Sequence, residues 1–220
     1  MESVEEEKDL GVWISMSLKP TKQCATAAKS ANFAMGQLLR SFHYRKKANL
    51  ILLYTTFVRP RLEFAAAAWI PWYEGVIRTL EKVQERFLKQ IPDVKGQTYE
   101  EKLRNAGITS LRERRKRGDA IEAFKTLGGF NNVNKHSWFD IADDSARSTR
   151  STSSVSDQGE EERKTNILKG KNVRLETRKN FYTVRVVKEW NVLPENVRKQ
   201  PNVNSFKNPY DEWANSTKTR

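Results

Sequence analysis

The chain has 220 residues, of which 37% are hydrophobic and 30% are charged, and its formal net charge is +13. This length suits one ordinary domain or two small ones, and the low hydrophobic fraction predicts that part of the chain stays unpacked. One cysteine and two histidines exclude a disulfide framework and a Cys/His zinc site, and no apolar run approaches the length of a bilayer span. We therefore expect an intracellular protein, nuclear or cytoplasmic, with a nucleic-acid partner, no membrane association, no cofactor and no bound metal.

The N-terminal residues change from acidic to alternating apolar. Residues 1–9 contain five acids and one base, a net charge of −4, and are interpreted as an acidic tail. Within 10–18 the apolar residues occupy every second position, which predicts a strand with these side chains on one face. A lone strand leaves its backbone groups unpaired, so we expect self-association through it. The face would comprise Leu10, Val12, Ile14, Met16 and Leu18.

The apolar period then becomes helical. A first helix, opened by Pro20, carries its stripe from Cys24 to Phe42. A second helix is expected over about 46–58, with a break or kink at Pro60 before a further helical piece. Its inward residues would be Leu50, Leu53, Tyr54 and Phe57. A third helix is expected to bury Val76, Leu80, Val83, Phe87 and Ile91.

Two capping boxes follow. Thr98 with Glu101 predicts a short helix that ends at Gly107. Ser110 with Glu113 predicts a longer helix over 110–127, stopped by two glycines. Short connections between these elements favour one compact helical bundle over 19–130.

The C-terminal third is expected to be more loosely organised. Residues 131–170, rich in serine, threonine and acids, are interpreted as a flexible linker, and 171–214 as a separate helical segment before a tail at 215–220. One helix should start at Thr177 and pass through Phe181 to Trp190. A last helix within 202–213 should begin late, because Pro209 inside it would cost about 3 kcal/mol. The fold class is therefore mainly α, a helical bundle with one N-terminal β-strand and a separate small helical C-terminal segment.

Four stretches resemble one protein family. They are Lys8–Ile14 (KDLGVWI), Val58–Ala65 (VRPRLEFA), Leu80–Arg86 (LEKVQER) and the segment from Arg178 to Pro194 that contains RKNF, RVV, WN and LP. In this order they resemble the region after the catalytic palm in reverse transcriptases of non-LTR, LINE-type retrotransposons, over about residues 7–213. The resemblance implies a last palm strand, a helical thumb that grips the primer–template duplex through its backbone, and a downstream extension.

The resemblance also implies that no catalytic residue is present. The family's metal-binding aspartates lie upstream of the position that corresponds to Leu10. The pair Asp143-Asp144, after Ile141-Ala142, is similar to the family's catalytic Ala-Asp-Asp but lacks the preceding aromatic residue and the flanking strands. We interpret these aspartates as linker acids.

Basic residues supply the expected binding site. Residues 40–61 contain six bases and no acid, and a second cluster occupies 112–117. Such clusters suit a sugar–phosphate backbone, although a helix surface kept solvated by charge, or a nuclear-localisation patch, is the alternative. The resemblance adds three bases of the third helix. The expected nucleic-acid-binding residues are Arg40, Arg45, Lys46, Lys47, Arg59, Arg61, Arg78, Lys82, Arg86, Arg112, Arg115 and Lys116.

Three functional hypotheses remain open. The first is a non-catalytic fragment of an RNA-directed DNA polymerase that binds RNA or DNA duplex without sequence specificity. The second is a co-opted protein-interaction module whose basic helices bind an acidic partner. The third is a partial gene product whose missing upstream part encodes an active reverse transcriptase.

Overall fold

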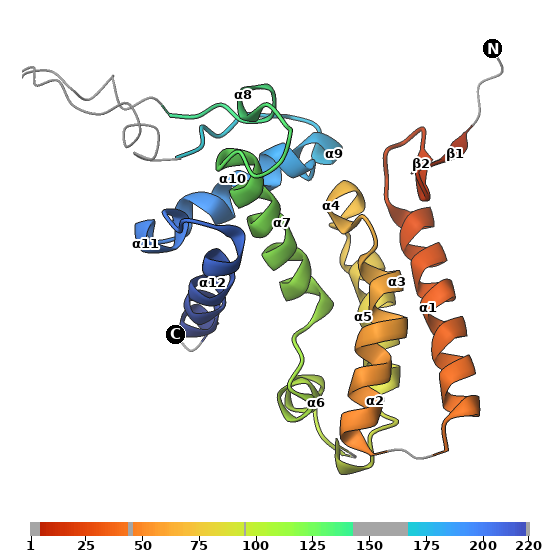
Figure 1. The fold of residues 1–220 in the computed structure, drawn as a ribbon. Coiled ribbons are helices and arrows are strands. Elements are labelled where there is room, and N and C mark those ends of the chain that lie inside the picture. Colours follow the sequence, from red (N-terminus) through yellow and green to blue (C-terminus); the bar gives the residue numbers. More distant parts are fainter. Residues whose placement is uncertain (1–4, 44–45, 95, 143–166, 219–220) are drawn as a thin grey trace, which may run out of the picture. The chain divides into compact units, whose positions relative to one another are not determined.

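The computed structural model describes residues 5–43, 46–94, 96–142 and 167–218, which form two compact units dividing between Lys116 and Arg117 (Figure 1). The predicted fold class, mainly α with an N-terminal strand, is confirmed. Unit 1 contains β1 (Glu6–Asp9), β2 (Val12–Ser15), α1 (Thr21–Ser41), α2 (Lys47–Leu53), the π-helix η1 (Tyr54–Val58), α3 (Arg59–Glu63), α4 (Ala66–Trp69), α5 (Glu74–Leu88), the 3₁₀-helix η2 (Pro92–Val94) and α6 (Tyr99–Ala106).

Helix α7 (Leu111–Leu127) begins in unit 1 and continues into unit 2. Unit 2 also contains α8 (Lys135–Trp138), α9 (Glu176–Lys179), α10 (Tyr182–Val192), α11 (Glu195–Arg198) and α12 (Val203–Lys218). The bundle expected over 19–130 therefore divides within its last helix. None of the helices in the described ranges combines the length and apolar character needed to cross a membrane.

The N-terminal strand is paired, which corrects the expectation of a lone strand. β1 and β2 form an antiparallel hairpin in which Glu6 faces Ser15 and Asp9 faces Val12, so the acidic segment supplies the missing partner. Leu10 and Gly11 make the two-residue turn, both with positive φ (44° and 88°), as the tightest hairpin turns require. Of the five apolar residues expected on one face, only Val12 is buried.

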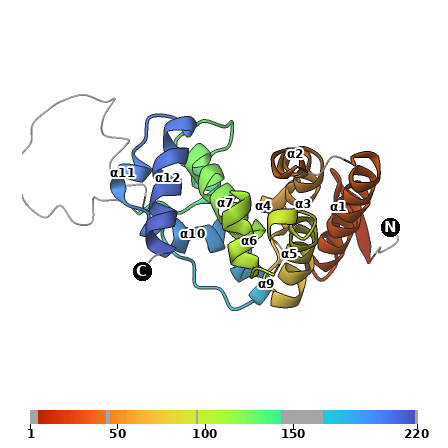
Figure 2. The ribbon, with the colours of Figure 1, turned by 90° about the horizontal axis from the view of Figure 1, so that it is seen from below.

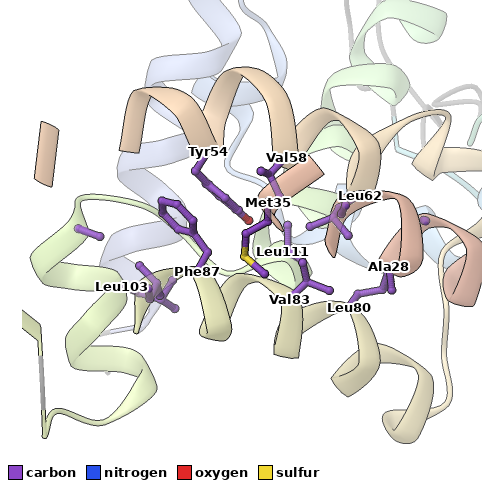
Figure 3. Close-up of a cluster of buried hydrophobic side chains, with 14 of the residues drawn as sticks. Ala28, Met35, Tyr54, Val58, Leu62, Leu80, Val83, Phe87, Leu103 and Leu111 are labelled. Carbon is purple, nitrogen blue, oxygen red and sulfur yellow. The ribbon is translucent and has the colours of Figure 1, made fainter. Parts of the chain in front are cut away.

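The core of unit 1 is built by three long helical elements. α1 packs against α5 and α3, and the continuous run α2–η1–α3 returns antiparallel to α1 before α5 runs in the direction of α1 (Figures 1 and 2). Small residues of α1, such as Ala28, let the helices approach closely, and larger side chains such as Leu80 and Phe87 fill the space between them (Figure 3). The stripe predicted for α5 is confirmed, with Val76 partly buried at its start.

The second helix differs from its prediction because it contains a π turn. Residues 54–58 adopt π geometry, in which the additional residue per turn rotates all later side chains around the axis. Val58 and Leu62 therefore point into the core, whereas Phe57, expected inside, is exposed. Pro60 lies in the first turn of α3 and does not break the helix. α3 ends at Glu63, two residues before Ala65, whose φ is 49°.

Both predicted capping boxes are present. The backbone N–H of Thr98 donates to Glu101 Oε2 (2.8 Å) and that of Glu101 donates to Thr98 Oγ1 (3.3 Å), and α6 ends at Gly107. The same reciprocal pair joins Ser110 and Glu113, at 3.3 and 3.2 Å, at the start of α7. Local sequence alone places these two helix ends.

Unit 2 packs around the C-terminal half of α7. Its buried residues include Phe124, Trp190 and Phe206. Phe139 and Leu168 are also buried, and Ile141 pairs with Leu168 in a β-bridge, so both ends of the segment expected as a linker (131–170) belong to the core of unit 2.

Two helix boundaries in unit 2 differ from expectation. The helix expected from Thr177 is two helices, α9 and α10, separated at Asn180 and Phe181, and Phe181 is exposed. α12 begins at Val203 with Pro209 in its interior. Burial of Phe206 and Tyr210 on the core side of α12 offsets the cost of the proline.

A buried polar chain links the helices of unit 1. The Tyr54 hydroxyl donates to Gln84 Oε1 (2.6 Å), and Gln84 Nε2 donates to the Tyr99 hydroxyl (3.0 Å) and to Thr109 O (3.1 Å). The Tyr99 hydroxyl in turn donates to Glu81 Oε2 (2.6 Å). Because Gln84 has no exposed surface, water cannot replace a missing partner.

We predict that Tyr54→Phe lowers the free energy of unfolding of unit 1 by about 1–3 kcal/mol, since it leaves Gln84 Oε1 buried and unpaired. Urea denaturation followed by circular dichroism measures this. Tyr73→Phe, which removes the same group from an exposed ring, is the matched control and should change stability little. Equal effects of the two substitutions would contradict the role of the chain.

Candidate nucleic-acid interface

One side of α1 is largely exposed and carries no acid of its own, although Glu6 of β1 forms an ion pair with Lys22 at its start. Lys22, Thr26, Lys29, Phe33, Gly36 and Arg40 follow one another at steps of four and three residues, so they form one stripe. Phe33, in the middle of the stripe, is 64% exposed. Single exposed apolar side chains are common on protein surfaces, so the interest of Phe33 rests on its place between Lys29 and Arg40 of the same stripe.

Arginines from two other helices lie at the edges of this stripe. On one side, Nη1 of Arg61 in α3 donates to Ser30 Oγ (3.0 Å), and its Nε donates to Phe57 O (3.2 Å). On the other side, Nη1 of Arg86 in α5 donates to Asn32 Oδ1 (3.4 Å). Lys82 is exposed one turn before Arg86 on the same side of α5. We call Lys29, Phe33, Gly36, Arg40, Arg61, Lys82 and Arg86 together the basic face.

The acids of α5 are occupied elsewhere in unit 1. Glu74 forms an ion pair with Arg112, and Glu85 pairs with Lys89, the residue that follows α5 (2.9 Å), which lowers the pKa of Glu85. Glu81 accepts hydrogen bonds from the backbone N–H groups of Arg112 (2.8 Å) and Leu111 (3.3 Å). The carboxylates of α5 are thereby drawn into pairs within the unit, and the positive charge of the basic face is left without a compensating acid among its own residues.

The structure separates the predicted binding residues into groups. Arg40, Arg61, Arg78, Lys82 and Arg86 are exposed, and all but Arg78 belong to the basic face. Lys46 and Lys116 are also exposed, and Lys47 is half-buried. Arg45 lies outside the described residues.

The second predicted cluster, 112–117, is largely used within the protein. Arg112 pairs with Glu74, and Arg114 makes a two-pronged contact with Glu63, through Nε to Oε1 and through Nη2 to Oε2 (3.0 Å). Arg117 binds Asp211 in the same manner, at 2.6 and 2.8 Å, within unit 2. Arg112 is exposed, and its ion pair with Glu74 is a long-range contact that the sequence does not reveal.

Arg115 is a clear correction. The sequence places it on the binding surface, but it is only 5% exposed and its guanidinium lies 6.0 Å from the centre of the Trp69 ring. Its Nε and Nη2 have no hydrogen-bond partner among the described residues. Burial lowers the pKa of Arg115, and it raises the pKa of the nearby Cys24 thiol to about 12.

Arg59 is also poorly placed for a phosphate. It is half-buried, and burial lowers its pKa, with a further contribution from the positive charge of Arg114. The negative charge of Glu63 acts in the opposite direction and raises the pKa of Arg59.

Sequence reasoning missed Lys29, Phe33 and Gly36. One available signal is that residues 10–62 contain nine bases and no acid, a longer acid-free stretch than 40–61. Gly36 gives a second signal, because a glycine inside a helix is unfavourable by about 1 kcal/mol relative to alanine. A Cβ atom at Gly36 would meet nothing within 4 Å, so packing within the protein does not require glycine there.

Asp143 and Asp144 lie outside the described residues. Within the part of the chain that the structure describes, no group of three or more His, Cys, Asp or Glu side chains is arranged to hold a metal ion. Comparison with known proteins finds no matching family model, no similar curated protein and no similar solved structure.

We predict that Arg115→Met leaves duplex affinity within about twofold of the wild type, because the guanidinium is buried. The free energy of unfolding should stay constant or rise by about 1–4 kcal/mol, as is common when buried charge is replaced by an apolar side chain of similar length. Fluorescence anisotropy with a labelled duplex and urea denaturation measure the two quantities. Arg86→Met, at an exposed arginine, is the matched variant and should weaken duplex binding. A tenfold loss of duplex affinity for Arg115→Met would show that Arg115 does belong to the interface.

Proposed function

We propose that unit 1 binds the sugar–phosphate backbone of an RNA or DNA duplex, without sequence preference, through the basic face, and performs no chemistry on it. The observation that carries the proposal is the meeting of bases from α1, α3 and α5 on the basic face, which includes no acid among its own residues. Backbone recognition fits because arginine and lysine side chains bind phosphate oxygens whatever the base sequence.

The resemblance to the thumb of LINE-type reverse transcriptases supports the same proposal, since that region grips a primer–template duplex. The chain would then contain the part of such a polymerase that holds the duplex. The acids of unit 1 near the basic face fit a binding role, because Glu63, Glu74 and Glu81 hold arginines or backbone N–H groups of unit 1.

Phe33 and Gly36 add a specific feature to the proposed interface. An exposed ring, followed one turn later by a position without a side chain, lets a ligand approach the α1 backbone closely. Glycine at this place is unfavourable for the helix and unnecessary for packing. Close contact with the ligand is therefore the role that we assign to Gly36.

We predict that duplex affinity falls steeply with salt, and that Lys29→Ala, Arg61→Ala and Arg86→Ala each reduce the slope of log K against log[salt] by about 0.9 for every phosphate that the variant no longer neutralises. Anisotropy titrations over a series of salt concentrations measure the slope. Arg104→Ala, an exposed base on α6 away from the basic face, should leave it unchanged. Salt-insensitive binding to a single acidic protein, with no duplex binding at low salt, would favour the interaction-module hypothesis instead.

We also predict that Gly36→Ala raises the stability of unit 1 by about 1 kcal/mol, through helix propensity, and weakens duplex binding. A gain in stability together with a loss of duplex affinity would indicate a binding role for Gly36, because a structural role would make both fall. Thermal unfolding and anisotropy on the same preparation measure both. Gly118→Ala, at an exposed glycine inside α7 where an added Cβ also meets nothing within 4 Å, is the matched control and should leave duplex binding unchanged. A Gly36→Ala variant that gains stability and binds as well as the wild type would remove Gly36 from the interface.

A further inference from the structure

Unit 2 contains a cavity of about 520 Å³, which lies within the range of small-ligand sites, roughly 300–1,000 Å³. It opens between the segment 128–136 that follows α7 and the end of α10 with α11. Its apolar part is formed by buried Phe124, Leu127 and Trp190. The basic face of unit 1 contributes no residue to it.

An aromatic ring is held at the side of this cavity. Phe130 is 47% exposed and stacks on Phe124, with 5.5 Å between ring centres and 15° between ring planes. A Cβ atom at Gly128 would lie 2.5 Å from Cε2 of Phe130, so this ring position requires a glycine at 128. The partly exposed ring of Phe130 is therefore held in a fixed position against the apolar side chains of the cavity.

The residues that line the cavity carry a net positive charge. Lys135 and Arg198 line the cavity from the two sides, and Nε of Arg198 donates to Leu193 O (3.1 Å), which orients the guanidinium. Glu195 is the one acid among the lining residues and is ion-paired with Lys199, which lowers the pKa of Glu195. The cavity lining has a formal charge of +2, from three bases (Lys135, Arg198 and Lys199) and one acid (Glu195).

We propose that this cavity binds one unpaired nucleotide of a single nucleic-acid strand, with its base stacked on Phe130 and its phosphate held by Lys135 and Arg198. Stacking on an aromatic side chain tolerates any base, and flanking cations neutralise the backbone, which is the combination that single-strand-binding proteins use. Asn134 and Gln200 in the lining can hydrogen-bond to base edges. The site is independent of the duplex interface proposed for unit 1, and neither proposal requires the other.

The test uses the full chain and a short labelled oligothymidylate, in a Lys29→Ala/Arg61→Ala/Arg86→Ala background that keeps the basic face from masking the cavity. Phe130→Leu and Lys135→Ala/Arg198→Ala should each lower affinity about tenfold or more. Phe181→Leu, which alters a ring with the same 47% exposure outside the cavity, and Lys188→Ala are the matched controls and should have little effect. Cavity variants that fold, as shown by circular dichroism, and bind as the controls do would overturn the proposal.

A second measurement does not depend on variants. Ultraviolet crosslinking of the unchanged protein to an oligonucleotide containing bromodeoxyuridine, followed by peptide mass spectrometry, should place crosslinks in the segment around Phe130. Crosslinks confined to unit 1 would overturn the proposal. So would displacement of the oligonucleotide from the cavity by a glutamate–tyrosine copolymer that binds more tightly, because that result identifies an acidic peptide as the occupant.

Discussion

The position of α6 and α7 in unit 1 depends on the hydrogen bonds that the Glu81 carboxylate accepts. It accepts hydrogen bonds from the Tyr99 hydroxyl (2.6 Å) and from the backbone N–H groups of Arg112 (2.8 Å) and Leu111 (3.3 Å), so one side chain of α5 holds α6 and the first turn of α7. Negative charge is favourable at a helix N-terminus, where N–H groups lack partners within the helix. The same network continues through Tyr99 and Gln84 to Tyr54 of η1. It therefore connects the run α2–η1–α3 to Glu81.

The acids and the bases of α5 lie on different sides of the helix and contact different neighbours. The side that carries Glu74 and Glu81 meets α7, where arginines and backbone donors neutralise it, and the side that carries Lys82 and Arg86 borders α1. In unit 1, Glu63, Glu74, Glu81 and Glu85 pair with bases or backbone N–H groups outside the basic face. The duplex-binding proposal therefore depends on which bases the fold leaves unneutralised rather than on how many the chain contains.

Unit 2 is organised by a different ion pair. Arg185 of α10 binds Asp119 of α7 through two parallel hydrogen bonds (2.8 and 3.0 Å), and both side chains are largely buried. Such two-pronged pairs fix geometry as well as contributing energy. They set α10 against α7, and these two helices supply Trp190 and Phe124, on which the cavity is built. Each unit thus has its own polar anchor, its own core and its own candidate ligand.

The sequence by itself determined the features that depend on neighbouring residues: the helical class, both capping boxes, the stripe of α5 and the start of α1 after Pro20. These are local because capping and helical periodicity act over three or four residues. Only the tertiary structure decided which partner β2 takes, how the π turn at 54–58 rotates Phe57 outward, and which arginines remain available. Arg112, Arg114 and Arg115 look alike in sequence, yet two are paired with distant acids and one is buried. Their fates differ because burial and ion pairing join residues far apart along the chain, and only the folded chain brings those residues together.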